Sequence, residues 1–161
     1  MSVKNCIYLF ITFGFLYSCK NKEVTFNDNL VSIQKSVLTQ VQDFGKKLQE
    51  INTDPLPLSN IKSEAQKIAL HIDTKIKEAQ RLNTPKGGEN LKAAILKQLE
   101  FEKDIIDKIG KLAPTNISKE EKDRIEIDFL NSKKKANKLE SSVNLAQEAF
   151  ALEHNFKLQK K

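Results

Sequence analysis

Residues 30–51 read LVSIQKSVLTQVQDFGKKLQEI and carry an apolar side chain at every seventh position. The repeating residues are Leu30, Val37, Phe44 and Ile51, and Val41 and Leu48 lie between them. Steps of three and four residues place these side chains on one face of an α-helix. Val31 and Leu38 widen that face, which favours a globular bundle over a two-stranded coiled coil. The stretch therefore predicts an amphipathic helix from Leu30 to Ile51.

Gly45 lies inside this predicted helix. A glycine there costs up to about 1 kcal/mol relative to alanine. We expect that Gly45 lets a neighbouring helix approach closely.

Three further stretches show the same spacing. We expect a second helix from Ser59 or Asn60 to Leu82, a third from Leu91 to Leu112, and a fourth that starts after Ser118. Their predicted core residues are Ile61, Ala65, Ile68, Ile72, Ile76, Ala79 and Leu82, then Leu91, Ile95, Leu99, Ile105, Ile106, Ile109 and Leu112, then Ile125, Phe129, Ala136, Leu139, Val143, Ala146 and Phe150.

The turn residues support these boundaries. All four prolines fall in the predicted loops 53–58, 83–88 and 113–117, because proline cannot donate a hydrogen bond inside a helix. Ser118 and Glu121 have the spacing of a capping box, which satisfies amide groups at the start of a helix.

Four amphipathic helices with short connections predict an all-α, antiparallel up-down-up-down four-helix bundle. The last helix could reach about 40 residues, or about 60 Å, against about 35 Å for the others. We therefore expect it to overhang at the end where the first helix begins. Phe150, Leu152 and Phe156 would form a candidate partner surface on the overhang, unless Val24 and Phe26 extend the first helix backwards and cover them.

The first residues have the layout of an export signal. Lys4 is followed by the apolar run Cys6–Leu16, and this run is well short of the roughly 20 residues that span a bilayer. Leu16, Ser18 and Cys19 resemble a bacterial lipobox, although Tyr17 is bulkier than usual.

That resemblance implies cleavage before Cys19 and a covalent lipid on its sulfur, because a thiolate is the strong nucleophile among common side chains. It gives a signal peptide at 1–18, a lipid-anchored tether at 19–29 and a bundle domain at 30–161. An ordinary secretory signal with a cysteine near the cut is the alternative. Since Lys20 follows Cys19 where an aspartate would favour the inner membrane, the resemblance implies the outer membrane. Whether the protein lies on the periplasmic or the surface face of that membrane stays open.

The charge is mildly basic, with 27 Lys and Arg against 21 Asp and Glu, and only Lys4 lies in the predicted signal. Lys133, Lys134 and Lys135 form a short run without stacking aromatic residues, which disfavours nucleic-acid binding. A solvated helix face or contact with lipid phosphates explains the run instead. Cys6 would be removed and Cys19 lipidated, so no disulfide is expected.

Candidate metal chemistry rests on two histidines. A di-iron bundle uses Glu-x-x-His on two helices, but Ile68 precedes His71 and Ala151 precedes His154 at that spacing. We therefore expect no metal, cofactor or catalytic residue, with His71 at the edge of an apolar face and His154 near a helix C-terminus, where a positive charge is favourable.

The C-terminal stretch 146–151, AQEAFA, followed by His154, Asn155 and Phe156, resembles the ending of a family of small, uncharacterised helical lipoproteins of bacterial surfaces. That resemblance implies a helical fold and an envelope location, and it brings no catalytic residues. Residues 38–42, LTQVQ, resemble the Leu-Thr-x-x-Gln element of periplasmic helical chaperones, in a single copy that helix periodicity also explains.

Two functions follow as expectations. The first is a membrane-anchored, non-catalytic structural or protein-interaction module of the cell envelope, with a protein partner of unknown identity. The second is a periplasmic chaperone. The absence of methionine after Met1 counts against the chaperone, because flexible methionine-rich surfaces suit promiscuous binding.

Overall fold

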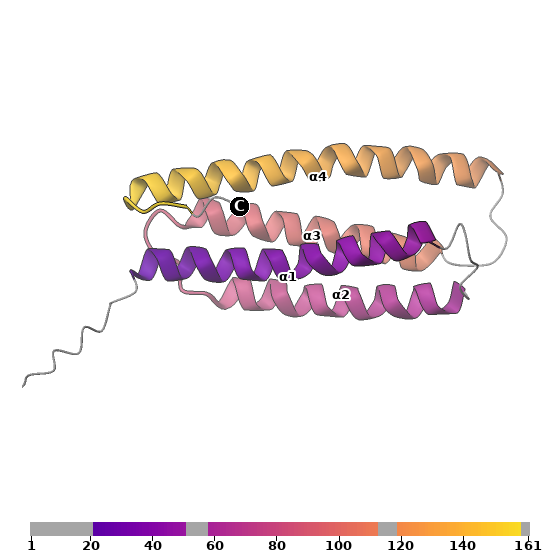
Figure 1. Ribbon diagram of the computed structural model, residues 1–161, viewed down its shortest axis with the longest axis horizontal. Helices are drawn as coiled ribbons and strands as arrows, with labels where there is room; N and C mark the ends of the chain where they lie inside the picture. The colour runs from indigo at the N-terminus through magenta and orange to yellow at the C-terminus, as the bar shows by residue number, and fades with distance from the viewer. Residues whose placement is uncertain (1–20, 51–57, 113–118, 159–161) are drawn as a thin grey trace, which may run out of the picture.

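The computed structural model describes residues 21–50, 58–112 and 119–158. Within those ranges the chain forms four helices and no strand: α1 (Lys22–Glu50), α2 (Leu58–Arg81), α3 (Glu89–Leu112) and α4 (Lys119–Glu153) (Figure 1). Successive helices run in opposite directions along one long axis (Figure 1). The predicted all-α, up-down-up-down bundle is confirmed.

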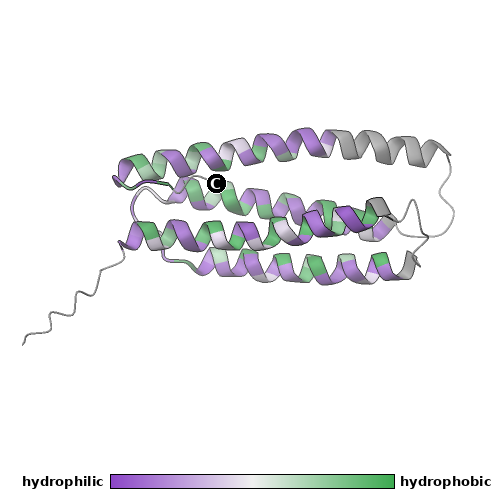
Figure 2. Ribbon diagram, viewed as in Figure 1, coloured by the Kyte–Doolittle hydropathy of each residue, from purple (hydrophilic) through white to green (hydrophobic). Residues whose placement is uncertain are grey.

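The core follows the apolar spacing of the sequence. Figure 2 shows hydrophobic residues recurring along the helices between hydrophilic ones. The predicted core residues that are buried are Leu30, Val37, Phe44, Ile61, Ala65, Ile68, Ile72, Ala79, Leu91, Ile95, Leu99, Ile106, Leu139, Val143 and Phe150. Burial of each large apolar side chain contributes about 1.5–3 kcal/mol to folding.

Helix α3 is the central element. It packs against α1, α2 and α4, while α1 packs against α2 as well. Helix α4 lies along one side of the bundle and rests mainly on α3 (Figure 1). Over residues 131–153 of α4, the buried side chains include Leu139, Val143 and Phe150.

Two pairs of amide side chains cross the interior. Gln34 Nε2 donates to Gln98 Oε1 at 2.7 Å and joins α1 to α3. Gln147 Nε2 donates to Asn27 Oδ1 at 3.0 Å and joins α4 to α1. Buried polar groups need such partners, so each pair fixes how its two helices align.

The first helix starts earlier than expected. It begins at Lys22 rather than Leu30, so the predicted tether through Asn29 is wrong beyond Asn21. Phe26 and Asn27 are buried in the bundle. The sequence signal is the spacing of Phe26, Leu30, Ile33 and Val37, which continues the apolar face backwards.

The overhang of the last helix is also corrected. Helix α4 has 35 residues, and its C-terminal end lies level with the start of α1 (Figure 1). It reaches past the other helices at its opposite end, where α4 begins (Figure 1). Extending α1 backwards to Lys22 is what brings the two ends level.

Gly45 does not mark a close contact between helices. A Cβ atom built on it would meet nothing within 4 Å. The close approach lies elsewhere, at Gly110 of α3, where a Cβ would lie 3.2 Å from the Cβ of Ala65 on α2.

Several predictions fall outside the described residues. They concern the signal segment 1–18, Cys19 and Ser118, together with the side chains of Ile125 and Phe129. Among the helices that are described, none is long and apolar enough to cross a membrane.

Candidate functional site

An aromatic cluster closes the end of the bundle where α1 begins and α4 finishes. The rings of Phe26 and Phe150 lie 5.7 Å apart between centroids, at 66°. Phe156 meets Phe150 at 5.8 Å and 74°, and the His154 ring lies 4.6 Å from Phe150. Edge-to-face aromatic pairs contribute about 0.5–1.5 kcal/mol beyond their burial. We call Phe26, Phe150, His154 and Phe156 the end cluster.

The C-terminal cap of α4 brings Phe156 into the end cluster. The backbone N–H of Phe156 donates to the Ala151 carbonyl at 3.0 Å, and that of Asn155 donates to the Leu152 carbonyl at 3.3 Å. Asn155 has a φ of 54°. These bonds form a Schellman motif, in which asparagine tolerates the left-handed conformation better than most residues. The motif turns the chain back so that Phe156 packs on Phe150.

The loop between α2 and α3 packs against the end cluster. A Cβ on Gly88 would lie 2.8 Å from Cε1 of Phe26, so only glycine fits there without displacement. His154 Nε2 lies 2.9 Å from the Lys86 carbonyl. A carbonyl only accepts, so His154 carries a proton on Nε2.

Lys92 holds this loop on the end of α2. Its Nζ donates to the carbonyls of Gln80 and Leu82, both at 2.8 Å, and lies 3.3 Å from Thr84 Oγ1. The last carbonyls of a helix have no partner within the helix, and a lysine is a favourable one. The loop is therefore a fixed part of the end of the bundle.

These contacts change the candidate partner surface. Phe150 is 2% exposed and Phe156 is half-buried in the end cluster, so neither presents a free ring. The expectation that α1 could extend backwards and cover them is confirmed for Phe26. Leu152 is 80% exposed and stays at the surface. The predicted lipidation site, Cys19, lies outside the described residues, three positions before α1.

Beside the end cluster lies an open hollow of about 540 Å³. It is lined by Lys22, Thr25, Phe26, Asn29, Leu82, Asn83, Thr84 and Pro85. The lining offers amide, hydroxyl and apolar groups and one charge, that of Lys22.

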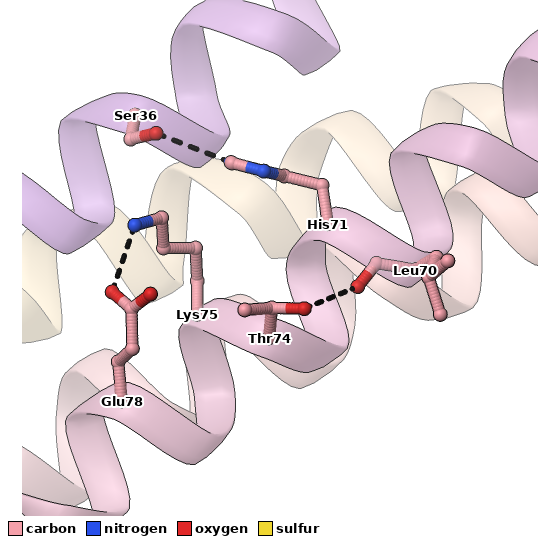
Figure 3. A network of polar contacts seen from close by, with 6 residues as sticks. All are labelled: Ser36, Leu70, His71, Thr74, Lys75 and Glu78. Carbon is pink, nitrogen blue, oxygen red and sulfur yellow. Dashed lines mark hydrogen bonds and ion pairs between the residues drawn. The ribbon is translucent and has the colours of Figure 1, made fainter.

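His71 lies in a groove between α1 and α2. Its Nε2 is 3.2 Å from Oγ of Ser36, and Figure 3 shows the two side chains pointing toward each other across the helices. On the next turn, Lys75 pairs with Glu78 at 2.7 Å. Burial lowers the pKa of His71, the charge of Lys75 lowers it further, and Glu78 opposes both. The net effect favours the neutral form of the His71 ring.

A serine beside a neutral histidine is the arrangement of a nucleophile and its base. Within the described part of the chain, no carboxylate accepts a bond from Nδ1 of His71 to orient the ring. Ser36 also lies inside a helix, whose amides are used by the helix itself and cannot stabilise an oxyanion. The pair serves best as a contact that joins α1 to α2.

The lysine run lies on the exposed part of α4. Lys133, Lys134 and Lys135 are exposed, and Nζ of Lys135 lies 4.8 Å from the centroid of the buried Phe101 ring. Lys135 therefore packs on the bundle, in a cation–π contact that the sequence did not reveal. The described residues contain no group of three His, Cys, Asp or Glu side chains that could hold a metal ion.

No family model matches this chain, and no curated protein or solved structure matches it either.

Proposed function

We propose that the protein is a lipid-anchored, non-catalytic interaction module of a bacterial cell envelope, attached to the outer membrane through Cys19. The observation that carries the proposal is the short apolar run that ends in Leu16, Tyr17, Ser18 and Cys19. Helix α1 begins at Lys22, so only Lys20 and Asn21 lie between the proposed anchor and the folded domain. The bundle would be held close to the lipid.

The arrangement of the anchored end supports this proposal. The end cluster, the fixed loop and the start of α1 all lie at one end of the bundle (Figure 1). Three acyl chains would contribute about 0.8 kcal/mol for each buried methylene, which gives a nearly permanent anchor. The rigid end of the bundle would then lie directly beside the anchor.

The exposed apolar side chains fit a binding module better than a chaperone for unfolded chains. Among the described residues, the exposed large hydrophobics are Leu70 on α2 and Leu145 and Leu152 on α4. Single exposed leucines are ordinary on a protein surface and form no broad apolar patch. With Phe150 and Phe156 in the end cluster, the partner surface moves to the outer side of α4.

Labelling with radioactive palmitate tests the anchor. We expect label on the wild-type protein and none on Cys19→Ala. Cys6→Ala is the matched control, because Cys6 lies in the segment that would be removed and its loss should leave the labelling unchanged. Label that enters Cys19→Ala as well as the wild type would refute the proposal, and so would an unlabelled wild type.

Protease treatment of intact cells, with and without permeabilisation, distinguishes the two faces of the membrane. Digestion of the bundle on intact cells would mean surface exposure, and protection until permeabilisation would mean a periplasmic location. The chaperone alternative predicts that near-stoichiometric protein suppresses light scattering by an aggregating client. Unchanged scattering would exclude it.

A further inference from the structure

We propose that the outer side of α4 binds a second copy of the same chain in antiparallel orientation. The proposal names a second copy as the occupant of the partner surface on the outer side of α4, and it stands without the lipid anchor. It concerns a stripe of exposed side chains that the bundle does not use.

The stripe follows helical spacing. Val143 and Phe150 mark the side of α4 that is buried against the bundle. On the opposite side, exposed residues recur at steps of four, three, four, three and four. They are Lys134, Lys138, Ser141, Leu145, Glu148 and Leu152, which we call the outer seam. Spacing of this kind marks one side of a helix, and two of the six residues on this side, Leu145 and Leu152, are apolar.

The outer seam contains two of the most exposed leucines. Leu145 is 67% exposed and Leu152 is 80% exposed, and they lie seven residues apart on the same side of α4. Covering them with another apolar or long side chain would remove that surface from water.

A shallow hollow lies in the outer seam. It is lined by Asn137, Lys138, Ser141, Ser142 and Leu145. Four of these residues have the spacing i, i+3, i+4 and i+7, which is the arrangement that receives a knob from a facing helix in a coiled coil. The two serines are small and leave room at the middle of the hollow.

The charges select a second copy and its direction. Lys134 and Lys138 occupy one half of the outer seam, and Glu148 occupies the other. Parallel pairing of two copies in register would place Lys138 beside Lys138 and Glu148 beside Glu148. Antiparallel pairing places Lys138 of each copy opposite Glu148 of the other.

The same antiparallel register also pairs the other residues of the outer seam. When Lys138 faces Glu148, Ser141 faces Leu145 of the second copy, and that leucine meets the hollow beside Ser142. Lys134 then faces Leu152, which its aliphatic stem can cover while its charge stays in water. A two-fold axis makes every contact occur twice. The outer seam is smaller than a standard interface, so we expect a weak dimer that high salt dissociates.

A zero-length carbodiimide cross-link between lysine and glutamate tests the pairing in the full chain extracted with a mild detergent. Within one copy, Lys138 and Glu148 are ten residues apart along α4, or about 15 Å. A direct bond between them therefore has to join two copies. We expect a cross-linked dimer whose digest contains the Lys138–Glu148 bond.

Exchanging the charges of Lys138 and Glu148 tests the proposed ion pairs between the two copies. Lys138→Glu and Glu148→Lys should each weaken dimerisation roughly tenfold, because each places like charges opposite one another at two symmetric positions. The double exchange restores both attractions and should restore the dimer. Leu70→Ser is the matched control, since Leu70 is equally exposed but lies on α2. These side chains are exposed, so far-UV circular dichroism should show unchanged folding for all variants.

Three results would overturn the proposal. They are the absence of a cross-linked dimer, a dimer that both single exchanges leave intact, and a double exchange that stays monomeric. Cys19→Ala should keep the cross-link whether or not the wild type incorporates palmitate, so failure of the anchor and failure of the outer seam are distinguishable.

Discussion

The ring of Phe150, near the end of α4, meets the ring of Phe26, near the start of α1, edge to face at 5.7 Å between centroids. These residues are far apart in sequence, and their contact closes the end of the bundle nearest the proposed anchor. Phe156 also meets Phe150 edge to face, because the Schellman motif turns the chain back. The end cluster therefore joins the two ends of the described chain.

Replacing Phe150 should strongly destabilise the fold. Phe150→Ala removes a fully buried ring, and we expect the free energy of unfolding to fall by about 3–5 kcal/mol. Leu152→Ala, two residues away at an exposed position, should change it by less than about 0.5 kcal/mol. Urea unfolding followed by far-UV circular dichroism suits the measurement, because no Trp is present and both Tyr residues lie in the predicted signal. Equal effects of the two substitutions would contradict the burial of Phe150.

Periodicity predicts the helices and most of the core because apolar side chains must share one face of each helix. It located the row that contains Val37 and Phe44 correctly. It placed the start of α1 too late, because Val24 and Phe26 are the only apolar residues among the polar ones of its first turns. That omission also misplaced the overhang and the candidate partner surface, since the position of Phe150 depends on what lies opposite it.

The buried amides could not be predicted from the sequence. Gln34 and Gln98 look like surface residues until the two helices are placed side by side, because the burial of one depends on the hydrogen bond from the other. The outer seam was hidden for a different reason. Periodicity left Leu145 outside the predicted core, but it did not show that Leu145 and Leu152 lie on one exposed side of α4, because that depends on how α4 packs on α3.

Asn155 should respond to substitution according to its backbone conformation. At a φ of 54°, Asn155→Gly should preserve or slightly raise the stability, because glycine adopts the left-handed region without strain. Asn155→Ala should lower it by about 1 kcal/mol. Thermal unfolding of the two variants side by side measures the difference. Alanine more stable than glycine at this position would mean that α4 does not end in the Schellman motif.

Alanine at Gly45 and alanine at Gly88 should change the free energy of unfolding in opposite directions. Gly45→Ala meets no atom within 4 Å inside a helix, so we expect a gain of up to about 1 kcal/mol in the free energy of unfolding. Gly88→Ala would push a methyl group to 2.8 Å from the ring of Phe26 and should cost about 1–3 kcal/mol. Urea unfolding of both variants gives the comparison. A loss of stability at Gly45 would show that a further contact requires glycine there.

Glu102 should make the stability of the fold depend on pH. Its side chain is buried on α3, and burial raises the pKa of its carboxyl group because a charge is poorly solvated there. The folded protein therefore holds this proton to a higher pH than the unfolded chain does. Between about pH 4 and the raised pKa, the folded state binds more protons, so stability falls as the pH rises through that window. The stability lost in that window is not regained at neutral pH.

Glu102→Gln removes this ionisation while keeping the shape of the side chain. Near pH 4 the variant and the wild type should be equally stable, since both side chains are then neutral. At neutral pH the variant should be the more stable, and the difference should grow across the window in which the wild-type carboxyl group ionises. Glu100 lies two residues before Glu102 on the same helix and is exposed. Glu100→Gln should therefore leave the free energy of unfolding unchanged at both pH values. Urea unfolding at a series of pH values measures the stability of both variants. If Glu102→Gln were less stable than the wild type at neutral pH, the folded protein would stabilise the Glu102 carboxylate, and burial would not be its main effect.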